Sequence, residues 1–122
     1  MRYTNESTIF CNTLSLQKIS LFNSVNQTKK ALKNGYNDKT RKIMLLFVSQ
    51  LFSYIRNVDE TARMIPPYIL DTLNKIPDVV IDDAYEKANK VRQEVKENKG
   101  CPSQKILNDF LESLDTLLIY RN

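Results

Sequence analysis

Apolar side chains recur every three or four positions along most of this 122-residue chain, with polar side chains between them. Such spacing is typical of amphipathic α-helices, because 3.6 residues per turn bring these positions onto one face. Four long stretches carry the pattern, approximately residues 13–32, 38–57, 77–99 and 103–118. The pattern therefore predicts an all-α fold, a mostly antiparallel bundle of four long helices.

Glycine and proline separate these stretches. Gly35 and Gly100 are the only glycines, and each follows a helical pattern, where a residue in the left-handed conformation closes a helix. Pro66 and Pro67 predict a helix stop, because the residue before a proline is pushed out of helical conformation. We expect one short extra helix after them, extending to about Ile76.

Polar residues at the starts of the stretches are candidate N-caps. Asp38 is the expected cap of the second helix, and Ser103 that of the last. Asp59 leaves two alternatives open: it caps a short segment of its own over 60–65, or the second helix continues through it.

The first residues and the second helix depart from the simple pattern. Residues 1–12 show no clean period and predict an N-terminal arm, followed by a single helical-bundle domain over 13–122. The second helix is apolar nearly all round, which indicates a central, buried element. Its excess apolarity, with that of the last helix, predicts some partly exposed apolar residues unless the short helix and the arm cover them: Phe47 or Phe52, and Ile119 with Tyr120.

The sequence contains no histidine and no glycine-rich loop. It therefore lacks the commonest general base, the commonest transition-metal ligand and a phosphate-binding loop. Carboxylates are the remaining candidates, but carboxylate metal sites in helical bundles generally add histidine. We therefore expect no enzyme activity, no metal and no cofactor, and interpret the acidic groups as helix-start and surface residues: Asp82, Asp83, Glu86, Asp109, Glu112 and Asp115.

Cysteine content and hydropathy bear on the cellular compartment. Cys11 and Cys101 lie too far apart for a zinc pattern, so we expect two reduced thiols, with a disulfide as the alternative. The longest apolar run, 43–48, is far shorter than the roughly 20 residues of a spanning helix. The first residues lack a secretory signal pattern. These features predict a cytoplasmic protein without a membrane span.

Charge is distributed unevenly along the chain. Residues 1–57 hold nine basic and two acidic side chains, whereas residues 58–122 hold nine basic and twelve acidic ones. Six cations crowd the first interhelical turn, where only Asp38 offsets them. We call these six the basic cluster, and we add Tyr36 as a candidate anchor: Lys29, Lys30, Lys33, Lys39, Arg41 and Lys42.

A positive field of this kind attracts acidic partners. The leading hypothesis is a non-enzymatic protein-binding module, such as an adaptor, regulator, inhibitor, immunity factor or accessory subunit, with apolar anchors and a steering cluster. The alternative is a nucleic-acid-associated protein or ribonucleoprotein component. Plain solubility, pairing with the acidic half, contact with an anionic membrane and homo-oligomerisation also stay open. Because Tyr36 is the one aromatic residue near the cluster, a stacking platform for single strands is missing.

Overall fold

The computed structural model describes residues 3–70, 75–97 and 102–121, without the side chains of residues 3–11 and of Leu70. Within these ranges it consists of helices and connections, with no strand. The helices are α1 (Tyr3–Leu32), α2 (Asp38–Met64), α3 (Pro67–Leu70), α4 (Asp78–Glu97) and α5 (Gln104–Leu118). The predicted all-α bundle of four long helices and one short one is confirmed.

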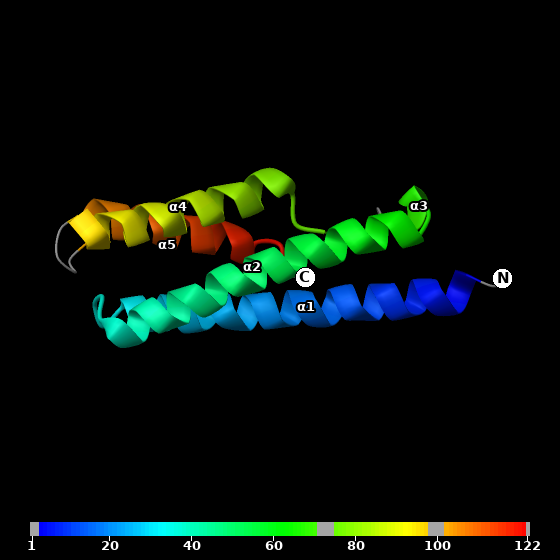
Figure 1. Cartoon of the computed structure of the whole chain (residues 1–122), viewed down its shortest axis with the longest axis horizontal. Coiled ribbons are helices and arrows are strands. Elements are labelled where there is room, and N and C mark those ends of the chain that lie inside the picture. Colours follow the sequence, from blue (N-terminus) through cyan, green and yellow to red (C-terminus); the bar gives the residue numbers. More distant parts are fainter. Residues whose placement is uncertain (1–2, 71–74, 98–101, 122) are drawn as a thin grey trace.

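The four long helices form two hairpins of unequal length. α1 packs along α2, α4 packs along α5, and the two hairpins meet through α1 with α5 and α2 with α4. α1 has 30 residues and is about 45 Å long, whereas α5 has 15 residues and is about 22 Å long. Figure 1 shows the second hairpin lying over the half of the first that contains the α1–α2 turn. The other half of α1 and α2 extends beyond it.

The α1–α2 turn is closed by glycine and capped by asparagine. Gly35 has φ +90°, and its N–H donates to the Leu32 carbonyl at 3.1 Å, as the predicted helix end requires. Asn37 then caps α2: its backbone is extended and its side chain accepts a hydrogen bond from the Thr40 N–H at 3.0 Å. The predicted cap, Asp38, is instead the first residue of the helix.

Helix ends elsewhere follow the sequence signals in part. Ser103 caps α5 as predicted, accepting from the Ile106 N–H at 3.4 Å. α2 continues through Asp59 and ends at Met64, so Asp59 caps no separate segment. Ile65 takes an extended conformation before the proline pair, as the restriction on pre-proline residues requires.

Two predicted boundaries differ from the structure. α1 begins at Tyr3, so residues 3–12 are helical rather than an arm. Extending an existing helix costs little, and no proline or glycine interrupts these residues. The short helix α3 spans Pro67–Leu70 within the described residues, and Lys75–Pro77 is not helical, so the predicted extent to Ile76 is wrong.

Buried apolar side chains from all four long helices form one core. Phe47 of α2 packs edge-on against Phe110 of α5, with ring centroids 5.8 Å apart. Tyr54 of α2 is 1% exposed, and its hydroxyl oxygen accepts a hydrogen bond from the Ile76 N–H at 2.9 Å. The first hairpin is thereby joined to the second at its core and at the connection that precedes α4.

Exposed apolar residues lie partly where the sequence predicts them. Phe52 is 48% exposed and Ile119 is 74% exposed, as expected. Phe47, by contrast, is fully buried, and Tyr120 is half-buried against the core. α2 contacts α1, α3 and α4, and touches α5 through Phe47, but these helices do not enclose it, since Leu46 is 61% exposed. No helix in the described ranges is long and apolar enough to cross a membrane.

Candidate functional site

The basic cluster surrounds the α1–α2 turn at one end of the molecule (Figure 1). The turn brings the last residues of α1 beside the first turns of α2, so cations from both helices share this end. Oδ1 of Asp38 lies 4.0 Å from Nε of Arg41, a distance at the limit of an ion pair. The Asp38 carboxylate is almost fully exposed. Five of the six cations are exposed: Lys30, Lys33, Lys39, Arg41 and Lys42.

Lys29 is the exception in the basic cluster. Its ammonium group pairs with the carboxylate of Asp115 on α5, and its side chain is only 30% exposed. This contact joins the two hairpins across the basic and acidic halves of the sequence. Lys29 therefore has a structural partner within the chain, in line with the pairing that the sequence left open.

Tyr36 occupies the turn but packs partly inward. Its side chain is half-buried against the core, and burial raises the pKa of its phenol. The guanidinium groups of Arg41 and Arg92 oppose this rise by favouring the phenolate. Arg92 comes from α4, so the second hairpin adds a cation to this end that the local sequence pattern does not reveal.

A shallow depression of about 270 Å³ lies between α1 and α2 beside this turn. Ala31 and half-buried Ile43 supply its apolar lining, and the exposed residues Lys30 and Lys39 supply its cations. Two further residues, whose side chains carry amides, complete the lining: Gln27 and Asn34. We call it the turn depression. It combines an apolar patch, hydrogen-bonding amides and positive charge within one small volume.

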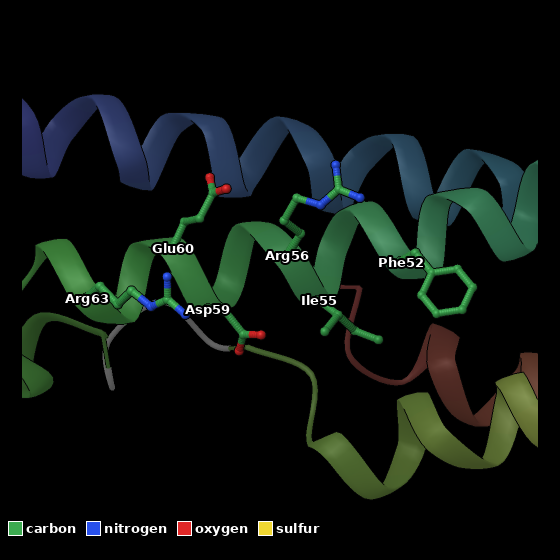
Figure 2. Close-up of a pocket in the computed structure, with 6 residues that line it drawn as sticks. All are labelled: Phe52, Ile55, Arg56, Asp59, Glu60 and Arg63. Carbon is green, nitrogen blue, oxygen red and sulfur yellow. The ribbon is translucent and has the colours of Figure 1, made fainter.

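A second depression, of about 330 Å³, is lined by one stretch of α2 (Figure 2). Phe52 forms one end and packs edge-on against Tyr85 of α4 at 5.1 Å between ring centroids. Figure 2 shows Asp59 and Glu60 pointing to opposite sides of the helix, so the two carboxylates do not converge on one reacting atom. General acid–base chemistry by this pair is therefore not supported by its geometry. The remaining lining residues are Ile55, Arg56 and Arg63.

Several acidic residues of α4 and α5 make side-chain contacts within the fold. Asp83 accepts a hydrogen bond from the Ser113 hydroxyl at 2.6 Å and lies 3.4 Å from the Lys87 ammonium. The Ser113 hydrogen bond, followed by Lys87, lowers the pKa of the Asp83 carboxyl. Glu86 pairs with Lys90 at 3.4 Å, as the i,i+4 spacing predicts. Among the described residues, no three acidic or cysteine side chains form a group that suits a metal ion.

Two sequence predictions fall outside what the structure describes. The thiol and disulfide alternatives concern Cys101, which lies outside the described residues, and Cys11, whose side chain lies outside them as well. Gly100 is likewise outside the described ranges. The turn depression, in contrast, is a feature that sequence analysis missed, because Ala31 and Ile43 come to line one surface only when α1 folds back on α2.

Comparison with known proteins gave no match. No family model fits the chain, and no curated protein and no solved structure is significantly similar to it.

Proposed function

We propose that this protein is a non-enzymatic protein-binding module whose turn end recognises an acidic protein surface. The single observation that carries the proposal is the set of five exposed cations around one turn, between which Asp38 is the one acidic residue along the sequence. Cations gathered on one end of an elongated molecule concentrate the local positive potential. Such a field raises association rates with an acidic partner by about 10- to 1,000-fold at low salt.

An apolar contribution to affinity comes from the same end of the first hairpin. Leu46 is 61% exposed, and it follows Ile43 of the turn depression by one helical turn on α2. Apolar side chains next to cations suit a protein interface, in which buried anchors supply affinity and rim charges supply orientation. The cluster alone would steer a partner, and these neighbours would retain it.

Nucleic acid is the second candidate, favoured by the same five cations. The half-buried position of Tyr36 weakens this alternative, because bases of single strands stack on exposed aromatic rings. The turn depression also contains no aromatic residue and is partly apolar. Both features favour a protein surface over a phosphate backbone.

The test is native affinity purification of the wild-type chain and of two variants from the source cell, each divided and half-treated with nuclease. The first variant carries Lys33→Glu, Arg41→Glu and Lys42→Glu. The matched control carries Arg56→Glu, Arg63→Glu and Lys75→Glu, which changes the net charge equally at exposed positions away from the turn. We expect a stoichiometric protein partner to survive nuclease with the wild type and the control, and to be lost with the first variant.

Kinetics with the identified partner then complete the test. We expect the turn variant to lower the association rate constant at least tenfold and the control variant to change it much less. Circular dichroism of each variant checks that the helices are intact. Loss of all partners after nuclease would indicate that the basic cluster binds nucleic acid. Equal effects of both variants on partner binding would overturn a local role for the turn.

A further inference from the structure

The turn depression has the chemistry of a specific recognition pocket. Its volume of about 270 Å³ is below the range of about 300–1,000 Å³ that holds a drug-sized ligand, and matches one or two amino-acid side chains. Ala31 and Ile43 offer apolar contact, while Lys30 and Lys39 come from different helices. Each depression residue that bears a net charge is a cation.

We infer that the turn depression binds a short acidic segment of a partner protein, with a branched aliphatic side chain against Ala31 and Ile43 and a neighbouring carboxylate beside Lys30 and Lys39. This inference rests on the proposed function and deepens it. Charge complementarity selects the carboxylate, and the apolar lining selects the aliphatic neighbour. The amides of Gln27 and Asn34 can donate to the main-chain carbonyl oxygens of the same segment.

The second depression of α2 contrasts with this one. Its two arginines are balanced by Asp59 and Glu60, so it lacks a net charge that would select a partner of one sign. The turn depression also lies within the basic cluster, so a partner steered to this end is brought close to it. Steering and recognition are therefore assigned to separate residues: Lys33, Arg41 and Lys42 steer, and the depression discriminates.

Two short peptides of equal charge test this inference. The first probe is acetyl-Glu-Leu-Asp-Glu-Leu-amide, and the second replaces both leucines by serine. We expect the leucine peptide to bind about tenfold more tightly, because a leucine that is partly buried contributes on that scale. In ¹H–¹⁵N spectra, its addition should shift the amide signals of Ala31, Asn34 and Ile43.

Variants of the depression separate its two contributions. Ile43→Ser should remove the preference for leucine over serine, whereas Lys30→Gln with Lys39→Gln should weaken binding of both peptides. Phe52→Ser, in the second depression, is the matched control and should leave the preference unchanged. Circular dichroism checks that each variant is folded. A single-stranded oligonucleotide, added in place of the peptides, tests the nucleic-acid alternative by the same amide shifts.

Equal affinity for the two peptides, or amide shifts confined to other surfaces, would overturn the depression as a recognition pocket. That result would leave the proposed function intact if the turn variant still loses its protein partner, since Lys33, Arg41 and Lys42 lie outside the depression lining. An oligonucleotide that shifts the same amides more strongly than the leucine peptide would overturn both proposals.

Discussion

The side chain of Asn37 organises the start of α2. Its Oδ1 atom accepts from the Thr40 N–H, and the Thr40 hydroxyl lies 3.2 Å from the same oxygen and 3.1 Å from the Gly35 carbonyl oxygen. Thr40 is 1% exposed, so its side of this network is protected from water, whereas Asn37 and Gly35 lie at the surface. One asparagine therefore connects the end of the turn with the first turn of the helix.

Removal of this cap is predicted to destabilise the fold. Asn37→Ala should lower the free energy of unfolding by about 1 kcal/mol, because an orphan helix N–H loses its acceptor. Asp38→Ala should cost less, since the Asp38 side chain is almost fully exposed and makes only a loose contact with Arg41. Urea unfolding measures both values, and Asn37→Asp should retain most of the stability. Equal losses for the two alanine variants would contradict this assignment of the cap.

Sequence patterns identified the turn but not the cap itself. Asparagine and aspartate are nearly equivalent as N-caps, and they are adjacent here. The choice depends on which backbone stays extended, with φ −151° and ψ −176° at Asn37. The role of Gly35 was predictable, in contrast, because tolerance of positive φ is a property of glycine itself.

At the scale of elements, α4 and α5 are joined by a hydrogen bond between a half-exposed and a buried side chain. Ser113 is 4% exposed and donates to Asp83, whose side chain is 45% exposed. This bond favours the charged carboxylate, which is why the pKa of Asp83 is lowered. Unfolded aspartate therefore binds a proton more readily than Asp83 in the fold.

This difference predicts a dependence of stability on pH. The contribution of Asp83 is fully present above its ordinary pKa of about 4 and is lost as pH falls from there through the lower folded pKa. Ser113→Ala should lower the free energy of unfolding by about 1 kcal/mol at pH 7, a value that already allows for screening by solvent. In strong acid the loss should be much smaller, because Asp83 is then protonated. Urea unfolding at pH 7 and pH 2.5 measures the two differences. The Asp83→Asn variant is the control, and a pH-independent difference would refute the coupling.

Element ends were predicted well where proline or a cap acts locally. Pro66 fixed the end of α2, and Ser103 the start of α5. The start of α1 was not predictable from periodicity, because residues 3–12 lack an apolar stripe. These residues continue the helix of residues 13–32 toward the N-terminus. In Figure 1 they lie alongside the half of α2 that projects beyond the second hairpin.

At the scale of the whole molecule, Tyr54 joins the two hairpins. Its hydroxyl oxygen accepts from the N–H of Ile76, and both residues are 1% exposed. Tyr54→Phe should lower the free energy of unfolding by about 1–3 kcal/mol, because a buried N–H then lacks a partner. Amide hydrogen exchange at Ile76 should accelerate in parallel.

The control for this prediction is Tyr85→Phe. Tyr85 is half-buried, and its ring contact with Phe52 does not require the hydroxyl, so this variant should be close to wild type in stability. An unchanged rate of amide hydrogen exchange at Ile76 in the Tyr54→Phe protein would show that the Tyr54 hydroxyl does not hold the two hairpins together. Urea unfolding with far-ultraviolet circular dichroism supplies the global stability in both cases.

The candidate site was predictable in charge but not in shape. Five exposed cations follow directly from the clustering of lysine and arginine around one turn. Two further features depend on how the hairpins pack. Lys29 pairs with Asp115 and is therefore not among the exposed cations, and Arg92 of α4 contributes a charge beside Tyr36. Such contacts join residues that are distant in the sequence, and periodicity within one helix carries no information about them.

The pairing of helices that are neighbours in the sequence also bears on how quickly this chain folds. Most contacts between helices form within α1–α2 and within α4–α5, across short connections. Contact order is therefore low, and helical proteins of low contact order fold in microseconds to milliseconds. Each hairpin can close before the two meet, with little loop-closure entropy to overcome. Newly made chains would then expose their apolar faces only briefly, which limits the time available for aggregation.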